Sequence, residues 1–207
     1  AGRSIPEEKY GISSIKQIMR GEPLALEVLA GNLPDHEVII VDLKVDPRSL
    51  VETLRAFKPD LVGITGTTCE ANTMVRLARE TKENANARVA VGGVHASLDP
   101  EFFNVQGIDF VVMGLGKQSF RELVISLEDR NARFRDIPGV ARTHPGEALQ
   151  FTPRAYDKAD LVDDAPPRYD LVHHYRAAYF LPSLQMKVGF VSSAFGCPFS
   201  CAFCSIG

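Results

Sequence analysis

Short apolar runs alternate with amphipathic stretches along residues 22–130 of this chain. The runs "VIIV", "LVGI" and "VAVGG" are apolar throughout, which is typical of strands that are buried on both faces of a sheet. In the intervening stretches, apolar residues recur at spacings of three and four, which predicts helices. This alternation predicts an α/β fold with a Rossmann-like, doubly wound parallel sheet.

The predicted elements follow one another in order. Strands are expected over 37–43, 59–66, 87–93 and 108–114, and helices over 22–31, 47–57, 69–84 and 117–129, with a short helix starting at "DPEFF" (99–103). Because the first helix has no strand before it, we expect a further strand upstream of Ala1.

The pattern changes after residue 130. The stretch 139–153 reads as a hairpin around "HPGE", and 156–182 reads as a linker that wraps a surface, because it is rich in Asp, Pro and Tyr and has no steady period. A strand pattern returns over 186–196. We therefore expect an α/β domain over 1–135, a hairpin and linker over 136–185, and the start of a further domain over 186–207.

Composition narrows the class of protein. The chain is 45% hydrophobic and carries a net charge of −3, so nothing indicates a nucleic-acid partner. No apolar run approaches the roughly 20 residues of a membrane helix, and the N-terminus lacks the apolar core of a signal peptide. The four cysteines are few and clustered, which favours a reducing compartment. We expect a cytoplasmic protein without a membrane partner.

Three cysteines, Cys197, Cys201 and Cys204, lie in the stretch "GCPFSCAFCS". A structural zinc site usually has four protein ligands in pairs, and a disulfide would leave one cysteine over. An iron–sulfur cluster fits better, because three thiolates on a four-iron cube leave one iron open to another ligand. The alternative is three unliganded core cysteines at a chance spacing.

The same stretch resembles the cluster motif of the radical S-adenosylmethionine enzymes. The resemblance implies that the three cysteines hold a 4Fe–4S cluster and that S-adenosylmethionine chelates the open iron. It implies that Phe203 lies along the adenine, and that reductive cleavage of S-adenosylmethionine gives a 5′-deoxyadenosyl radical. It also implies an electron donor such as flavodoxin or ferredoxin. Residues 186–207 would then start the radical S-adenosylmethionine domain.

Three loops of the α/β part, "TGTTCEA" (65–71), "VGGVHAS" (91–97) and "VVMGLGKQSFREL" (111–123), resemble the cobalamin-binding domain of cobalamin-dependent radical S-adenosylmethionine enzymes. Each loop follows a predicted strand, and the carboxyl ends of parallel strands share one edge of a sheet. The glycines would admit the corrin ring near the backbone, and the hydroxyls would bond its amide arms and nucleotide tail. The candidate cofactor-binding residues are Thr65, Gly66, Thr67, Thr68, Cys69, Gly92, Gly93, Val94, His95, Ser97, Gly114, Leu115 and Gly116.

Many cobalamin domains carry the motif Asp-x-His-x-x-Gly, whose histidine binds cobalt, and this chain lacks it. We therefore expect base-off cobalamin with no protein imidazole below the metal, its benzimidazole tail tucked into the sheet. Cys69 either covers the lower face of cobalt or is a small core residue. His95 either contacts the corrin or caps a helix that begins near Ser97. Replacing Gly93 by Val is expected to block the corrin and leave the fold intact.

The favoured function is that of an enzyme, a cobalamin-dependent radical C-methyltransferase acting on a small-molecule substrate. Some relatives in this class carry out cyclisation or ring contraction instead. Two alternatives stay open: a radical enzyme whose α/β domain does not bind cobalamin, and a cobalamin carrier without catalysis. We do not expect these 207 residues to be active alone, because only the first strand and the cluster loop of a catalytic barrel are foreseen.

Overall fold

The computed structural model describes residues 21–46, 49–128, 134–156, 165–181, 186–192 and Ala202. Four strands form the main sheet in the order β1-β2-β3-β4: β1 (Leu61–Thr65), β2 (Arg88–Gly92), β3 (Phe110–Val112) and β4 (Val140–Arg142). The first three are parallel, with Leu61 opposite Arg88 and Ala90 opposite Phe110, and β4 is antiparallel to β3. The expected α/β fold with a parallel sheet is confirmed.

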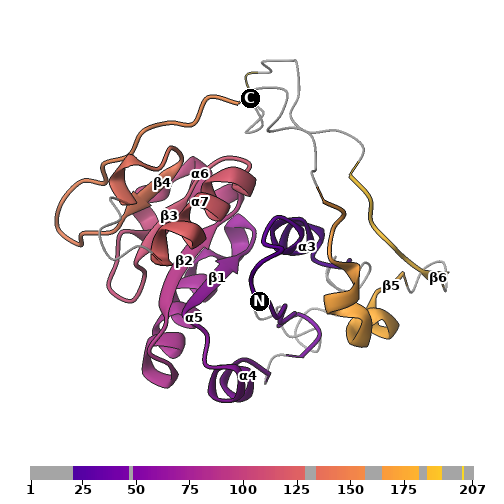
Figure 1. Cartoon of the computed structure of the whole chain (residues 1–207). Coiled ribbons are helices and arrows are strands. Elements are labelled where there is room, and N and C mark those ends of the chain that lie inside the picture. The colour runs from indigo at the N-terminus through magenta and orange to yellow at the C-terminus, as the bar shows by residue number, and fades with distance from the viewer. Residues whose placement is uncertain are drawn as a thin grey trace.

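Helices cover both faces of this sheet (Figure 1). On one face, α5 (Ala71–Asn84), α6 (Val94–Leu98) and the 3₁₀ helix η2 (Pro100–Phe103) enclose a core that includes Met74 and Val91. On the other face, α7 (Lys117–Glu128) and η3 (Phe134–Asp136) pack over Ala90 and Phe110. Neighbouring residues of β2 thus point into different cores, which is why the strand reads as an unbroken apolar run.

The predicted strand over 37–43 is wrong, because the structure records no strand within that stretch. Its apolar residue Ile40 is 4% exposed and packs beside Ala30 and Tyr179. Buried Asp42 accepts a hydrogen bond from the Tyr179 hydroxyl at 3.1 Å. The segment therefore packs between α3 (Leu24–Gly31) and residues 172–179, while α4 (Ser49–Phe57) follows it as expected.

The predicted hairpin over 139–153 is also wrong. A turn does form at "HPGE", where the Glu147 N–H donates to the His144 carbonyl at 2.9 Å, but β4 pairs with β3, and residues 148–153 form no strand. A single bond, from the Gly139 N–H to the Thr152 carbonyl at 2.8 Å, links the two sides of the predicted hairpin. The reason is burial, since Val140 is fully buried in the core under α7. The sheet that begins at β1 thus extends past residue 135.

Within the expected linker, residues 165–178 lie against α3, as expected of a segment that wraps a surface, but they carry regular structure. The 3₁₀ helix η4 (Tyr169–Ala178) packs on α3, and β5 (Phe180–Leu181) pairs with β6 (Met186–Lys187) in a separate two-stranded sheet (Figure 1). Phe190 is held from both sides: its N–H donates to Glu22 at 2.6 Å, and its carbonyl accepts from the Tyr169 hydroxyl at 3.1 Å.

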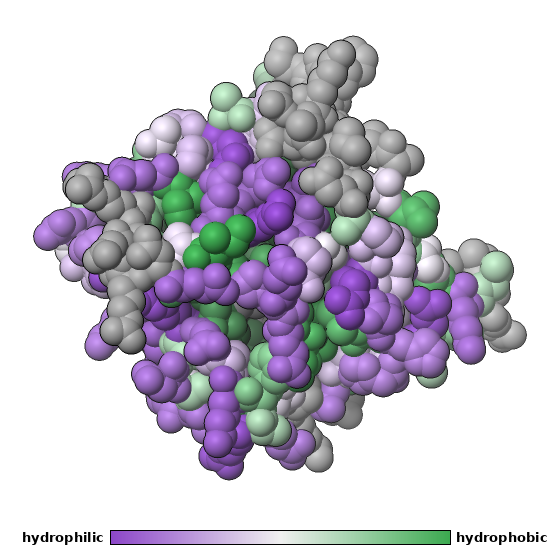
Figure 2. Space-filling view, viewed as in Figure 1, coloured by the Kyte–Doolittle hydropathy of each residue, from purple (hydrophilic) through white to green (hydrophobic). Residues whose placement is uncertain are grey.

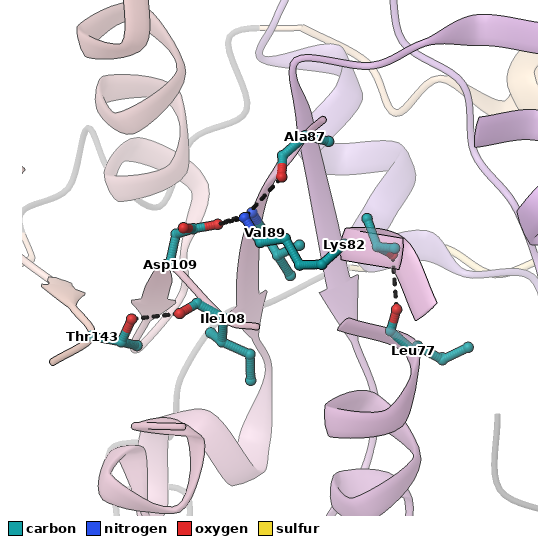
Figure 3. A network of polar contacts seen from close by, with 8 residues as sticks. Leu77, Lys82, Ala87, Val89, Ile108, Asp109 and Thr143 are labelled. Atoms are coloured by element: carbon teal, nitrogen blue, oxygen red, sulfur yellow. Dashed lines mark hydrogen bonds and ion pairs between the residues drawn. The ribbon is translucent and has the colours of Figure 1, made fainter. Parts of the chain in front are cut away.

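A polar network closes the edge of the main sheet where the parallel strands begin (Figure 3). The carboxylate of Asp109 accepts the Val89 N–H at 2.6 Å and pairs with Lys82, whose ammonium also donates to the Ala87 carbonyl at 2.9 Å. Thr143, just after β4, donates to the Ile108 carbonyl at the same edge. The Val89 N–H and the Ala87 and Ile108 carbonyls at this edge are therefore bonded by the protein's own side chains.

Candidate functional site

The opposite edge, where β1, β2 and β3 end, brings the three predicted loops together. The Ser97 hydroxyl donates to the Gly93 carbonyl at 3.0 Å and accepts the Gly114 N–H at 2.9 Å, so it ties the second loop to the third. A Cβ atom on Gly93 would lie 2.7 Å from the Thr65 Oγ1 atom, which places the first loop directly beside the second. We call this surface, formed by residues 65–70, 93–98 and 114–116, the carboxyl edge.

The first loop is held from beneath by a buried carboxylate. Glu70 is 1% exposed and its Oε2 atom accepts the backbone N–H and the hydroxyl of Thr67, at 2.8 and 2.9 Å. The ammonium of Lys44 lies 3.8 Å from the other carboxylate oxygen. This reciprocal cap shapes the 3₁₀ turn η1 (Thr68–Glu70) and leaves Thr68 and Cys69 exposed on the edge.

The third loop turns on two glycines in left-handed conformation, Gly114 and Gly116, both with φ of +74°. A Cβ atom on Gly114 would lie 1.8 Å from the hydroxyl oxygen of Tyr156. That hydroxyl also accepts the Leu115 N–H at 2.9 Å. Gly114 is therefore required by a side chain of the protein itself, whereas the sequence assigned it to the approach of a ligand.

The carboxyl edge exposes large apolar side chains. Val94 is 52% exposed, Leu98 53% and Leu115 39%, and they stand among the exposed threonines 65, 67 and 68. Hydrophilic side chains cover most of the molecular face in Figure 2, and hydrophobic ones gather toward its middle. An edge that combines exposed aliphatic groups with hydroxyls suits a large ligand that is partly apolar and partly polar.

Beneath the second loop, Gly93 is fixed by packing. Its φ is +101°, and an added Cβ would lie 3.0 Å from the Gly66 carbonyl oxygen as well as close to Thr65. Replacing Gly93 by Val would therefore distort two loops, and the expectation that this variant keeps its fold is wrong. Gly66 is confined similarly, since its Cβ would lie 3.1 Å from both Glu70 and the sulfur of Met74. Gly92 has more room, with its closest neighbour at 3.4 Å.

The structure bears on the two residues for which the sequence left alternatives open, Cys69 and His95. Cys69 is exposed, so its interpretation as a small core residue is wrong. His95 lies inside α6, which begins at Val94, so it does not cap a helix near Ser97. Its ring packs edge-to-face on Phe102 and Phe103, with centroids 5.0 and 5.6 Å apart.

Three residues of this region were missed from the sequence: Leu98, Phe151 and Tyr156. Leu98 is the last residue of α6, which begins at Val94, whereas the sequence "VGGVHAS" predicted a helix that begins near Ser97. Phe151 and Tyr156 reach the edge from a part of the chain assigned to a hairpin and linker. No local pattern marks them, because their neighbours are distant in sequence.

The cluster motif, with Cys197, Cys201, Phe203 and Cys204, lies outside the described residues. Within the part of the chain that is described, no group of three or more His, Cys, Asp or Glu side chains could hold a metal ion. None of the described helices is both long and apolar enough to span a bilayer.

Comparison with known proteins gives a family for the first part of the chain. Residues 16–124 match the B12 binding domain family. An uncharacterized methyltransferase of Pyrococcus horikoshii is 33% identical over 93% of this chain, and an anaerobic magnesium-protoporphyrin IX monomethyl ester cyclase of Rubrivivax gelatinosus is 29% identical over 88% of it. The chain spans 43% and 33% of the lengths of these two relatives.

Solved structures share the fold. The radical S-adenosylmethionine methyltransferase TsrM from Kitasatospora setae, with cobalamin and a [4Fe-4S] cluster bound, aligns over 72% of this chain and 29% of its own, with a TM-score of 0.58 and 23% identity. The cobalamin-dependent radical enzyme OxsB, with aqua-cobalamin and S-adenosylmethionine bound, aligns over 82% of this chain and 24% of its own, with a TM-score of 0.62 and 16% identity.

Proposed function

This chain belongs to the B12 binding domain family, and we propose that it is part of a cobalamin-dependent radical S-adenosylmethionine enzyme that methylates carbon in a small molecule. One observation carries the proposal: the carboxyl edge of the sheet, inside the family segment, exposes apolar side chains and hydroxyls on three interlocked loops. Ligands of open α/β sheets bind at this edge.

The residues of the edge fit cobalamin. Val94, Leu98 and Leu115 offer the apolar surface that a corrin ring needs, and their exposure gives them an area to bury on binding. The hydroxyls of Thr65 and Thr68 lie on the same exposed edge and can bond amide arms. Two other hydroxyls of the edge already have partners in the protein: Thr67 bonds Glu70, and Ser97 accepts the Gly114 N–H.

Cobalamin, when bound, supplies a cobalt centre that can carry a methyl group. The chain's own role is to bind it, orient it and exclude water from one face. The cap between Thr67 and Glu70 and the bridge through Ser97 keep the loops in place before the ligand arrives, which lowers the ordering cost of binding. Cys69, exposed on η1, is the side chain that we assign to face the cofactor when it is bound, with Thr68 as its neighbour.

The second half of the proposal concerns Cys197, Cys201 and Cys204, which we assign as ligands of a 4Fe–4S cluster whose open iron binds S-adenosylmethionine, with Phe203 beside the adenine. The spacing of the three thiolates supports this assignment. An external electron donor, such as flavodoxin or ferredoxin, would supply the reducing electron. Methyl transfer is favoured by the name of the Pyrococcus horikoshii relative, and cyclisation is the alternative that the cyclases suggest.

The cobalamin assignment is tested by absorption spectroscopy. The chain, mixed with hydroxocobalamin and passed through a desalting column, should retain the corrin bands in about one-to-one ratio. Replacing Leu98 by Asp should weaken binding at least tenfold, because a carboxylate would be desolvated against the corrin. Ile125→Asp is the matched control, since Ile125 is 48% exposed toward the far end of α7. A wild-type chain that retains no corrin would refute the cobalamin assignment.

The cluster assignment is tested separately. After anaerobic reconstitution, the wild type should contain about four irons and four sulfides and show a broad charge-transfer shoulder. Each of the variants Cys197→Ala, Cys201→Ala and Cys204→Ala should lose the cluster, and Cys69→Ala should keep it. Full iron content in any of the first three variants would show that the cysteine turn does not hold the cluster.

A further inference from the structure

A segment beyond the family match, residues 149–156, runs across the carboxyl edge; we call it the strap. Its first half is held by two hydrogen bonds. The Leu149 N–H donates to Glu101 of η2 at 2.7 Å, and the Thr152 carbonyl accepts the Gly139 N–H, next to β4, at 2.8 Å. The strap is thus anchored to η2 and to the residue that precedes β4.

The end of the strap meets the third loop through Tyr156. Its hydroxyl accepts the Leu115 N–H at 2.9 Å and lies so close to Gly114 that a Cβ atom there would be 1.8 Å away. The tyrosine hydroxyl therefore occupies the space that a side chain at residue 114 would need, and glycine leaves that space open. Since the Ser97 hydroxyl accepts the Gly114 N–H, two successive N–H groups of the loop are fixed by side chains from different elements.

The strap also adds surface to the carboxyl edge. A cavity of about 280 Å³ lies between strap and loop, lined by residues that include Ser97, Met113, Phe151 and Tyr156. The side chains of Phe151 and Tyr156 are 40% and 42% exposed, which is similar to the 39% of Leu115. The tyrosine hydroxyl is also bonded to the Leu115 N–H. The apolar part of the edge therefore continues past the family segment onto the strap.

Arg154, which lines this cavity, is held by several polar contacts. The Arg154 guanidinium donates to the Ser119 hydroxyl at 2.9 Å and to the Pro138 carbonyl at 3.3 Å, and it pairs with Glu122 of α7. Ser119 in turn donates to Pro138 at 2.8 Å. Because Arg154 lies two residues before Tyr156, this network fixes the tyrosine's backbone relative to α7.

We propose that the strap is a fourth element of the cobalamin site and that Tyr156 is its positioning residue. The inference rests on the proposed cobalamin function. The phenol holds the Gly114–Gly116 turn in its left-handed form, which keeps Leu115 turned outward, and the rings of Tyr156 and Phe151 extend the surface that the corrin covers. Tyr156 acts on the cofactor mainly through the Leu115 amide that it binds.

The test compares two tyrosine hydroxyls. Tyr156→Phe removes the bond to Leu115 and keeps the ring, and Tyr179→Phe, the matched control, removes a buried hydroxyl bonded to Asp42. Dissociation constants for hydroxocobalamin are measured by absorption titration, and stability by urea unfolding of each apo chain. We expect affinity to fall about fivefold to tenfold for Tyr156→Phe, the value of one hydrogen bond, with little change in the urea midpoint. The control should lower the midpoint and leave affinity unchanged.

A second variant, at Phe151, tests the role of the strap without changing the Tyr156 hydroxyl. Phe151→Ser shortens an exposed side chain and should weaken cobalamin binding several-fold if the corrin covers it. Wild-type affinity in both Tyr156→Phe and Phe151→Ser would overturn the role of the strap while leaving the cobalamin function standing. Failure of the wild type itself to bind cobalamin would overturn both proposals.

Discussion

Glu27 of α3 is a buried acid that has no hydrogen-bond partner in the described part of the chain, and its replacement by glutamine should stabilise the protein at alkaline pH. The side chain is fully buried, and neither carboxyl oxygen has a partner among the described residues. Burial, together with repulsion from Glu22, raises the pKa of Glu27 from 4.5 to about 7, although Arg176 partly offsets the rise.

The size of the effect follows from this shift. Between pH 4.5 and 7 the folded chain keeps a proton on Glu27 that the unfolded chain loses, so the free energy of unfolding falls as pH rises through that window. Above pH 7 the penalty is complete and amounts to about 3 kcal/mol. Glu27→Gln removes the ionisation. It should match the wild type at pH 4.5 and be about 2 to 3 kcal/mol more stable at pH 8.

The assay is urea unfolding followed by circular dichroism from pH 4.5 to 8.5. Glu70→Gln is the matched control, because Glu70 is equally buried but its carboxylate accepts both donors of Thr67 and lies near Lys44. That variant should be less stable than the wild type at pH 8. A Glu27→Gln variant whose stability stays parallel to the wild type across the whole pH range would refute the reasoning.

Two further predictions address the sheet and the metal. Asp109→Ala removes the acceptor of the Val89 N–H and the ion-pair partner of Lys82 at the edge away from the site, so it should lower the free energy of unfolding by about 1 to 3 kcal/mol. Cobalamin affinity should be unchanged when measured on the folded variant; a tenfold loss of affinity would contradict this separation. Bound cobalamin in the cobalt(II) state should show no nitrogen superhyperfine triplet in electron paramagnetic resonance, because no protein imidazole or benzimidazole is expected below the metal; a triplet would show an axial nitrogen ligand.

The sequence predicted the elements whose stability is local and periodic. Strand β2 and helix α5 were found because Val89 and Val91 belong to an unbroken apolar run, and because Met74, Leu77 and Ala78 repeat with the helical period. The order of the three loops on one edge followed from the parallel arrangement alone.

The misses depend on contacts between distant residues. The run at 37–43 has strand composition, but Asp42 is bonded by Tyr179, which lies 137 positions away, and no local pattern reports that bond. The same holds for Gly114. A side chain at Gly114 would clash with the Tyr156 hydroxyl, which also binds the N–H of the neighbouring Leu115. Tyr156 lies 41 residues after Leu115, so the sequence alone suggested only space for a ligand.

Amide hydrogen exchange of the wild-type chain with and without hydroxocobalamin tests the central claim, that cobalamin binds the carboxyl edge, most directly. The account predicts that cobalamin slows exchange in peptides covering 65–70, 93–98 and 114–116, and leaves exchange around Asp109, at the opposite edge, unchanged. Cobalamin that binds the chain without slowing exchange in these three loops, or that protects the Asp109 edge instead, would contradict it.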